Sequence, residues 1–386
     1  MSTLLPPFCE PLPYRSDSSD YFNRIRHLPW PVFFDSTTEA TQDNRYDIIA
    51  ASPFKTLTTY GQQTTVETPK STEIVSGDPF QILQQQLSQH PKQATTNLPF
   101  CGGAIGLFTY DLGRQIEDLP NIAANQEHAA DMLVGLYDWA IVTDHKLKQC
   151  YLASFKLDVS TEQNWQQLIS LLNAEHVPPK QTMTVSGDLN SQLETAQYNT
   201  AFDKIKDYIR EGDCYQVNLA KRFEISAGGD PWHVYALLRK QNAAPFSCFF
   251  DTPKLSIISS SPERLLKLKQ GQVETKPIKG TRPRDLTNPK RDIALANELQ
   301  NSIKDRAENL MIVDLLRNDL GKVCQPGSIS VPKPFALESF ATVHHLVSTI
   351  TGILGENETA VSLLRACFPG GSITGAPKLR AMEIIE

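Results

Sequence analysis

The sequence Lys276-Pro-Ile-Lys-Gly-Thr-Arg-Pro-Arg284 is the stretch around which the fold and the chemistry of this chain are expected to be organised. Two prolines and a glycine keep it out of regular helix. Short apolar runs on either side of Gly271 predict a hairpin just before it. If that hairpin is centred on Gly271, Glu263 and Lys279 lie roughly opposite each other. We therefore expect a carboxyl group and an amine to share one end of a sheet.

The amine of Lys279 is the candidate nucleophile, and its chemistry depends on its proton. A lysine is nucleophilic only when neutral, and a reference pKa of about 10.4 leaves this side chain protonated near neutral pH. Burial and nearby positive charge both favour the neutral amine, and we expect that charge to come from Lys276, Arg282 and Arg284. The alternative is a basic surface loop in which Lys279 only pairs with Glu263, and spacing alone favours this alternative.

The composition is that of an ordinary globular chain, long enough for two domains. The 386 residues are 40% hydrophobic and 21% charged, and a net charge of −6 without a run of Lys and Arg argues against a nucleic-acid partner. No apolar run approaches about 18 residues and no signal-peptide pattern is present, so no membrane association is expected. The seven cysteines are scattered and never spaced as Cys-x-x-Cys, which indicates neither disulfides nor zinc and fits a reducing cytoplasm.

Apolar periodicity and turn residues predict an α/β chain. Strands are expected at 31–34, 47–50, 55–60 and 215–220, as a pair around Asp144, and within 335–354, and helices at 79–87, 165–172, 198–209 and 291–323. The polar, Pro-containing segment 177–191 is the best linker candidate. Core positions are expected on two of the helices, at Tyr198, Phe202, Ile205 and Ile209 and at Leu295, Leu299, Ile303, Leu310 and Leu315.

Two glycine-rich segments look like nucleotide-binding loops but lack the required spacing. The run 102–113 has no Gly-x-Gly-x-x-Gly, and closely packed strands explain it better. In the second segment, Gly370-x-x-x-x-Gly375 is followed by Ala376-Pro377 instead of Lys and Ser or Thr, which excludes a phosphate loop. The helix expected after it can still bind a carboxylate at its first turn.

Five separated motifs have more weight together than any one of them alone. They are Tyr215-Gln-Val-Asn-Leu, Ser261-Pro-Glu-Arg, Pro277-Ile-Lys-Gly-Thr, Lys304-Asp-Arg-Ala-Glu-Asn-Leu-Met-Ile-Val-Asp-Leu and Phe368-Pro-Gly-Gly-Ser-Ile-Thr-Gly-Ala-Pro-Lys. In this order they resemble the chorismate-binding enzymes, which include the anthranilate, isochorismate, salicylate and aminodeoxychorismate synthases. The resemblance implies an α/β fold of the anthranilate synthase component I type, with two facing sheets and helices outside. It also implies an N-terminal region at 1–180 and a chorismate-binding catalytic region at 190–386.

Within this family, the residue at the Lys279 position distinguishes the reactions. Alanine there is typical of anthranilate formation, whereas the resemblance implies that lysine marks the members that make 4-amino-4-deoxychorismate for para-aminobenzoate and folate. In those members the lysine attacks C2 of chorismate as the C4 hydroxyl leaves, and ammonia from a glutamine amidotransferase partner then attacks C4 and expels the lysine. Glu263 matches the general acid that protonates the departing hydroxyl. Gln216 stands where water-using members have a lysine base, and an amide cannot deprotonate water, which disfavours isochorismate or salicylate formation.

The resemblance implies further site residues. Glu308 matches a ligand of Mg²⁺, which would neutralise the ring carboxylate of chorismate, and His345 matches an active-site histidine. The substrate pocket is expected to be lined by Thr281, Gly371, Thr374 and Gly375. A tryptophan site is expected at Ser36, Pro245 and Phe246, although Asp-Ser in place of Glu-Ser predicts no strong feedback inhibition.

Members of the family continue beyond the equivalent of Glu386 with another carboxylate for Mg²⁺, an arginine and a glycine-rich loop. The resemblance therefore implies a catalytic region that is truncated at its C-terminus. Two functions other than amination are left open. One is an anthranilate synthase component I, and the other is an inactive module that only binds tryptophan or an amidotransferase partner.

Overall fold

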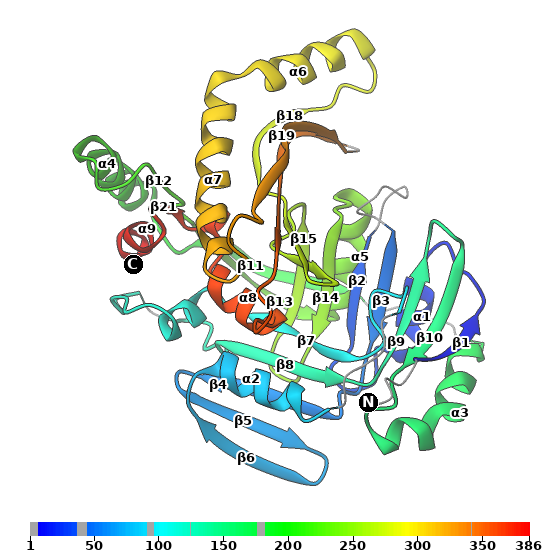
Figure 1. Cartoon of the computed structure of the whole chain (residues 1–386). Coiled ribbons are helices and arrows are strands. Elements are labelled where there is room, and N and C mark those ends of the chain that lie inside the picture. Colours follow the sequence, from blue (N-terminus) through cyan, green and yellow to red (C-terminus); the bar gives the residue numbers. More distant parts are fainter. Residues whose placement is uncertain (1–6, 37–44, 91–95, 124, 176–181, 341) are drawn as a thin grey trace. The chain divides into compact units, whose positions relative to one another are not determined.

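The computed structural model describes residues 7–36, 45–90, 96–123, 125–175, 182–340 and 342–386 (Figure 1). By their internal contacts the residues form two compact units. Unit 1 comprises Met1–Leu112, Glu127–Ser186 and Ala227–Pro262, and unit 2 comprises Gly113–Gln126, Gly187–Ser226 and Glu263–Glu386. Each unit is therefore assembled from segments that are separated in the sequence. The division at 1–180 and 190–386 stays a prediction.

Among the described residues, unit 1 contains a seven-stranded antiparallel sheet in the order β1-β10-β9-β3-β2-β14-β15 and a five-stranded one in the order β6-β5-β4-β8-β7. The larger sheet consists of β1 (Phe8–Leu12), β2 (Val32–Asp35), β3 (Tyr46–Ala50), β9 (Trp139–Asp144), β10 (Gln149–Ser154), β14 (Phe246–Asp251) and β15 (Ser256–Ser261). The smaller consists of β4 (Lys55–Tyr60), β5 (Gln63–Thr68), β6 (Ser71–Ser76), β7 (Gly103–Phe108) and β8 (Met132–Tyr137). The strands predicted at 31–34, 47–50 and 55–60 and around Asp144 are confirmed.

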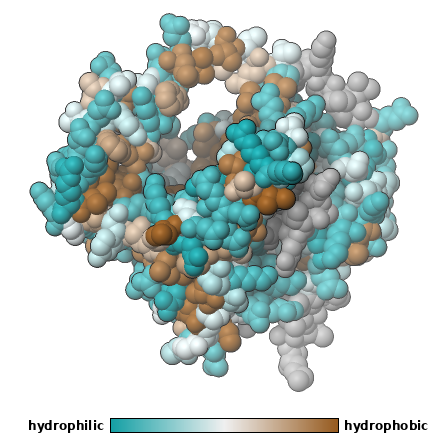
Figure 2. All heavy atoms as spheres, turned by 90° about the horizontal axis from the view of Figure 1, so that it is seen from above, coloured by the Kyte–Doolittle hydropathy of each residue, from teal (hydrophilic) through white to brown (hydrophobic). Residues whose placement is uncertain are grey.

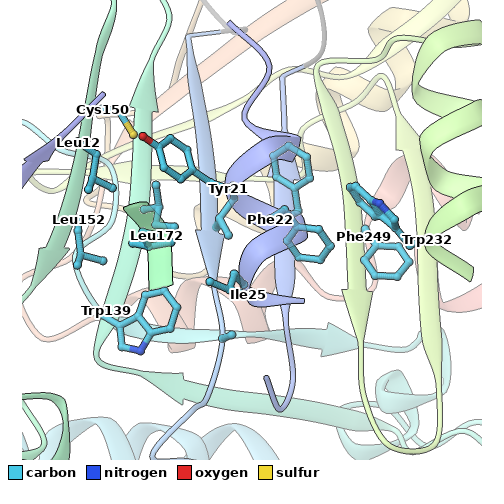
Figure 3. Close-up of a cluster of buried hydrophobic side chains, with 14 of the residues drawn as sticks. Leu12, Tyr21, Phe22, Ile25, Trp139, Cys150, Leu152, Leu172, Trp232 and Phe249 are labelled. Carbon is cyan, nitrogen blue, oxygen red and sulfur yellow. The ribbon is translucent and has the colours of Figure 1, made fainter. Parts of the chain in front are cut away.

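Helices α1 (Ser19–Ile25), α3 (Val159–Asn173) and α5 (Pro231–Gln241) bury an aromatic core against the larger sheet, and α2 (Pro79–Ser88) packs on β5 of the smaller one. Figure 3 shows Phe22 of α1 near Trp232 of α5 and Phe249 of β14, and the ring centroid of Phe22 lies 4.5 Å from that of Trp232. A second buried cluster, with Val142 from the larger sheet and Ile105 from the smaller, joins the two sheets. The predicted α/β class, with facing sheets and outer helices, is confirmed.

Unit 2 is built around β20 (Val343–Ile353), the central strand of a five-stranded antiparallel sheet in the described part of the chain. Strands β17 (Gln272–Thr275) and β18 (Ile278–Pro283) pair with successive halves of β20, and β19 (Ser330–Ser339) pairs along its other edge. The short β16 (Lys267–Lys269) pairs with β17. Helices α7 (Ile303–Gly321) and α8 (Ala360–Cys367) form a buried cluster with β17 and β20.

The other elements of unit 2 surround this sheet. They are α4 (Thr195–Glu211), α6 (Pro289–Asn301), α9 (Lys378–Ile385) and the short strands β12 (Gln216–Val217) and β21 (Gly375–Ala376), with η2 (Gly371–Ile373) before β21. The Ser302 hydroxyl accepts a hydrogen bond from the backbone N–H of Asp305, so Ser302 ends α6 and caps α7. This residue splits the helical stretch predicted at 291–323 into two helices.

Three sequence predictions in this region differ from the structure. Residues 177–181 of the predicted linker lie outside the described residues, and β11 (Met183–Ser191) is a strand paired with β13 (Phe223–Gly229). The strand predicted at 215–220 is reduced to β12. None of the described residues of α4 is buried, and Phe202 is 46% exposed, so its predicted core packing is wrong. Periodicity identifies an apolar face but not whether another element covers it.

The predicted core positions on α7 were also partly wrong. Ile303 is 87% and Leu310 57% exposed, whereas Leu299 on α6 is fully buried as predicted. The buried side chains of α7 are instead Ile312, Val313, Leu316 and Leu320. Apolar residues occur on more than one face of this helix, so the spacing could not indicate which face meets β20.

Seen from above, Figure 2 shows polar and apolar residues intermixed, with the apolar ones in several separate groups. In the described part of the chain, no helix combines the length and the apolar character needed to cross a lipid bilayer. All seven cysteines are free thiols, which agrees with the prediction that the sequence holds no disulfide framework.

Candidate active site

The hairpin predicted before the central stretch is present and brings Glu263 to β18. Strands β16 and β17 pair as Lys267↔Glu274 and Lys269↔Gln272, with Gln270 (φ 52°) and Gly271 (φ 77°) as the turn. Both φ values are positive, as a two-residue hairpin turn requires. Glu263 lies just before the hairpin. Its carboxyl accepts a hydrogen bond from the Ile278 amide and interacts electrostatically with Lys279. The predicted juxtaposition of acid and amine is therefore present in unit 2.

Gly280 separates Lys279 from Thr281 and gives β18 its irregular shape. The pairing of β18 with β20 changes register between Ile278 and Thr281, and Gly280 has a φ of 91°. A Cβ atom at Gly280 would lie 2.9 Å from both Cβ of Asp305 and Cδ1 of Leu299. No other residue type fits both the positive φ and the close approach of the helices. This glycine allows the strand to bulge at the candidate nucleophile.

The Lys279 amine is held by a backbone carbonyl of the glycine-rich segment. Lys279 Nζ donates to the Ser372 carbonyl oxygen at 3.2 Å, and the side-chain amide of Asn218 donates to the same oxygen at 2.7 Å. The backbone N–H of Asn218 donates to the Thr374 carbonyl at 3.0 Å. Asn218 thus ties the loop that contains Ser372 to the segment after β12, which fixes the acceptor for the lysine.

The sequence analysis missed both Asn218 and Ser372. Asn218 lies in the motif that begins at Tyr215 and is the one residue of that motif whose side chain bonds the glycine-rich loop, so the motif itself was the available signal. Ser372 accepts the hydrogen bond of Lys279 through a main-chain oxygen, which every residue type has. Side-chain patterns therefore give no signal for this contact.

Burial raises the pKa of the Glu263 carboxyl. The Ser372 hydroxyl, the positive charge of Lys279 and the Ile278 amide act in the opposite direction and offset the increase only in part. A carboxyl group in this environment retains its proton to higher pH than a free glutamate. That property suits a general acid.

His345 lies on β20 directly opposite Thr281 of β18. Its Nδ1 is 2.9 Å from the Thr281 hydroxyl, its ring contacts the ring of Phe340 edge-on at 5.5 Å, and 8% of the residue is exposed. Burial lowers the pKa of His345, and a backbone hydrogen bond with Gly280 and the charge of Glu338 offset this in part. The imidazole is therefore neutral at physiological pH.

The three neighbouring cations expected to favour a neutral lysine are neutralised themselves. Each is paired with a carboxylate: Lys276 with Glu338 at 2.7 Å, Arg282 with Glu298 at 2.8 Å and Asp305 at 3.2 Å, and Arg284 with Asp292 at 2.9 Å. These carboxylates offset the positive charge of the three side chains, and their effect on Lys279 stays a prediction. The carboxylates come from β19, α6 and α7, and their proximity was not evident from the sequence.

Gln216 and the glycine-rich segment meet through the pairing of β12 with β21. Gln216 is opposite Ala376, and a Cβ atom at Gly375 would lie 2.1 Å from the Gln216 carbonyl oxygen. The Gln216 side-chain oxygen is buried and has no hydrogen-bond partner among the described residues. Thr374 is fully buried, and its hydroxyl donates to the Gly371 carbonyl at 3.2 Å. The roles of Thr281, Gly371, Thr374 and Gly375 in substrate binding stay predictions.

Glu308 is the predicted ligand of Mg²⁺, and it lies on α7 with its side chain 41% exposed and 3.8 Å from Lys304. Asp305, one turn earlier, is paired with Arg282. Across the residues that the structure describes, no group of three His, Cys, Asp or Glu side chains forms a metal centre. Glu308 could offer one carboxylate, so Mg²⁺ bound here would need oxygen atoms from water or substrate as well. Its role as a ligand stays a prediction.

The residues predicted to bind tryptophan lie in unit 1. Strands β2 and β14 are neighbours, so Ser36 follows β2 close to the start of β14, where Pro245 is buried and Phe246 half-buried. The Ser36 backbone N–H and hydroxyl both donate to Asp47 Oδ1, at 2.9 and 2.8 Å, and Asp47 Oδ2 is 2.7 Å from His145 Nε2. Tryptophan binding at Ser36, Pro245 and Phe246 stays a prediction.

A groove of about 460 Å³ in unit 2 is lined by Tyr215, Leu315, Asp319 and Lys378 among others. Lys279, Glu263 and His345 are not part of its lining. Asp319 in its wall is neutralised by Lys378 at 2.5 Å and Lys322 at 3.3 Å. We therefore place the candidate chemistry at β18 and the glycine-rich loop and not in this groove.

Known proteins are similar to this chain over most of its length. Residues 32–386 match the family described as chorismate binding enzyme. The chain is 46% identical to aminodeoxychorismate synthase component 1 of Salmonella typhimurium over 389 aligned positions, which cover 100% of this chain and 84% of that protein. The chain belongs to the chorismate-binding enzyme family. The resemblance recognised from the five motifs is confirmed.

Two further relatives carry the name anthranilate synthase component 1 or component I. Anthranilate synthase component 1 of Mycolicibacterium smegmatis is 37% identical, with 80% of this chain and 63% of that protein aligned. The solved structure of anthranilate synthase component I from Streptococcus pneumoniae superimposes with a TM-score of 0.79 at 30% identity, covering 90% of this chain and 78% of that chain. This likeness confirms the predicted fold type.

Proposed function

We propose that this chorismate-binding enzyme aminates chorismate, forming 4-amino-4-deoxychorismate as component 1 of an aminodeoxychorismate synthase. The observation that supports this proposal most is the Lys279 amine, held 3.2 Å from the Ser372 carbonyl beside the buried carboxyl of Glu263. The similarity to aminodeoxychorismate synthase component 1 over the whole length of this chain supports it independently. The product feeds para-aminobenzoate and folate formation.

The reaction consists of two displacements that share Lys279. In the first, Lys279 Nζ bonds to C2 of chorismate, the ring double bonds shift, and the C4–O bond breaks while Glu263 gives its proton to the departing oxygen. Water leaves, and Glu263 becomes a carboxylate. In the second, ammonia bonds to C4, the double bonds shift back, and the C2–N bond breaks so that Lys279 leaves as a neutral amine. The new C4 ammonium returns a proton to Glu263, and the net change is replacement of hydroxyl by amine with release of water.

The environment of Lys279 and Glu263 favours the proton distribution that the first step needs. The two groups interact electrostatically, and burial favours the uncharged form of the acid. A single proton transfer from the lysine ammonium to the carboxylate therefore creates the nucleophile and the general acid together. The Ser372 carbonyl accepts one N–H of the amine and so orients its lone pair.

Gln216 supports amination over addition of water. Its buried amide oxygen, unpartnered among the described residues, can accept a hydrogen bond from substrate but cannot remove a proton from water. The neutral imidazole of His345, held through Thr281, can orient a polar group of the substrate without adding charge. The amide at position 216 therefore favours ammonia over water as the incoming nucleophile.

We further infer that Mg²⁺ participates, with Glu308 as its protein ligand. Mg²⁺ is commonly held by one or two carboxylates together with water and ligand oxygens, and the partly exposed Glu308 can meet that need. When bound, the metal neutralises the ring carboxylate of chorismate. Titration calorimetry of chorismate with and without Mg²⁺, repeated on Glu308→Gln, tests this role.

The ammonia is proposed to come from a glutamine amidotransferase subunit. The designation component 1 of the Salmonella typhimurium relative supports the existence of a second component. Function in the reducing cytoplasm is consistent with seven free thiols. Tryptophan remains a proposed ligand of unit 1 at Ser36, Pro245 and Phe246, and calorimetry with tryptophan tests it directly.

The decisive experiment supplies chorismate, Mg²⁺ and ammonium chloride and identifies the product by liquid chromatography and mass spectrometry. The proposal expects 4-amino-4-deoxychorismate. Anthranilate with pyruvate would identify an anthranilate synthase, the reaction named for the 37% identical relative. Absence of turnover with retained Mg²⁺-dependent chorismate binding would identify a binding module.

A further inference from the structure

We propose that His344, held by Asp292 and Ser339, is a positioning residue that fixes the active-site ring of its neighbour His345. This inference rests on the proposed function, because it concerns how a residue of that site is held. His344 is 3% exposed, and its two ring nitrogens bond to elements on either side of it. No motif of the sequence indicated this arrangement.

The anchor of the arrangement is the Asp292 carboxylate in the first turn of α6. It accepts from Arg284 Nε at 2.9 and 3.1 Å, from the Asp285 backbone N–H at 2.9 Å and from His344 Nε2 at 3.0 Å. The Arg284 hydrogen bond, followed by the Asp285 amide, lowers the pKa of Asp292 to about 2. Asp292 is therefore an acceptor only, and His344 Nε2 must donate.

This donation fixes the orientation of the His344 ring. With Nε2 at Asp292, Nδ1 lies 2.7 Å from the Ser339 hydroxyl and shares a hydrogen bond with it. The ring is thereby attached to α6 through Asp292 and to β19 through Ser339. A flipped ring would lose both partners.

Two connections lead from His344 to His345. The first is the strand itself: successive side chains of β20 point to opposite faces, so His344 points to the Arg282 and Ser339 positions while His345 points to Thr281. Fixing one ring therefore fixes the backbone orientation of the other. A sideways shift at His344 displaces the ring of His345 from the Thr281 hydroxyl.

The second connection passes through Arg284 and Phe340. Arg284, which grips Asp292, also donates from Nη1 to the Phe340 carbonyl at 3.0 Å, and its backbone N–H donates to the Thr342 carbonyl at 2.9 Å. The Phe340 ring in turn lies edge-on against His345, with centroids 5.5 Å apart. Arg284 therefore binds both Asp292 and the Phe340 main chain at the end of β19, and the Phe340 ring packs on His345.

The test compares His344→Phe, which removes both ring hydrogen bonds at similar size, with His344→Gln, whose side-chain amide can still donate to Asp292. The matched control is Glu298→Gln, which removes an ion pair between the same helix α6 and β18 that touches neither Asp292 nor Phe340. The first readout needs no catalysis: the ring NMR signals of isotopically labelled histidine in the full chain, with His345 assigned from His345→Gln.

We expect His344→Phe to shift the His345 ring signals and its titration midpoint, His344→Gln to restore both, and Glu298→Gln to change neither. In turnover, His344→Phe should lower kcat by about 10- to 100-fold, as displacement of a reacting group does, with KM for chorismate within about twofold. If His344→Phe does not fold, Ser339→Ala replaces it, since that variant removes only the bond to Nδ1. Unchanged His345 signals in a folded His344→Phe or Ser339→Ala would overturn the proposal. Because the NMR readout is independent of product, failure of the proposed function would not be confused with failure of this inference.

Discussion

The amine of Lys279 and the main-chain oxygen of Ser372 are 3.2 Å apart, and this pair joins the irregular strand β18 to the glycine-rich loop. The lysine comes from the central stretch at 276–284, and its partner lies 93 residues further along the chain. The chemistry of the site depends on keeping these segments together.

Replacing Lys279 should abolish amination. Lys279→Ala removes the nucleophile, and Lys279→Arg retains the positive charge without a nucleophilic amine, so we expect kcat to fall on the order of 10³-fold or more in both. Product chromatography measures the loss. Intact-protein mass spectrometry of acid-quenched wild-type enzyme should detect a chorismate-derived adduct that both variants lack. Normal turnover by Lys279→Arg would exclude covalent catalysis.

Glu263→Gln should lower kcat by about 10²- to 10⁴-fold, because the variant cannot donate a proton to the leaving hydroxyl. The pair of Lys279 and Glu263 must hold one proton between them, so activity of the wild type should decline as the pH falls through the folded-state pKa of Glu263, which burial raises. The same shift means that Glu263 contributes stability below its unfolded pKa and loses it as pH rises through the folded pKa. Glu263→Gln should therefore gain stability relative to wild type at high pH. A pH profile in which Glu263→Gln keeps the acid limb of the wild type unchanged would contradict the assignment.

Gly280→Ala should destabilise the protein more than Gly271→Ala. Both glycines have positive φ, 91° and 77°, but only Gly280 has neighbours within 3 Å of an added Cβ, whereas nothing lies within 4 Å at Gly271. We expect a loss of about 1–2 kcal/mol at Gly271 and about 2–5 kcal/mol at Gly280, where strain and overpacking add. Urea unfolding measures the difference. Equal losses at the two sites would mean that α6 and α7 can move away from β18.

The pair of Asp47 and His145 in unit 1 should make stability depend on pH. The hydrogen bond with Asp47 raises the pKa of His145 above its unfolded value, so the stabilisation is complete below about pH 6.5 and is lost as pH rises through the folded pKa. Asp47→Asn should reduce this loss of stability as the pH is raised above about 6.5. Tyr14→Phe is the matched control, since it deletes the 3.2 Å contact to His145 Nδ1 and leaves the pair with Asp47 intact. Denaturant unfolding across this range tests the difference.

The parts of the site that sequence reasoning predicted are those encoded locally. The turn at Gly271 placed Glu263 near Lys279 because a short hairpin brings its two flanks together. The register differs by one residue from the predicted one, since the turn is centred between Gln270 and Gly271, and Glu263 accepts from the Ile278 amide next to Lys279. The irregular strand was likewise signalled by Pro277 and Gly280.

The parts that sequence reasoning could not predict depend on segments distant in the chain. The carboxylates that neutralise Lys276, Arg282 and Arg284 come from other elements, and the Ser372 acceptor is a main-chain atom. The buried face of α7 was misassigned for the same reason, because Leu310 and Leu316 differ in what covers them and not in hydrophobicity.

The interleaved path of the chain between units has a consequence for biosynthesis. Strands β14 and β15 and helix α5 complete the larger sheet of unit 1, yet they follow residues of unit 2 in the order of translation. A nascent chain that has emerged only as far as residue 226 therefore exposes β2 as an open edge, which is a template for association between chains. This edge can be covered only after the next 36 residues, 227–262, have been synthesised.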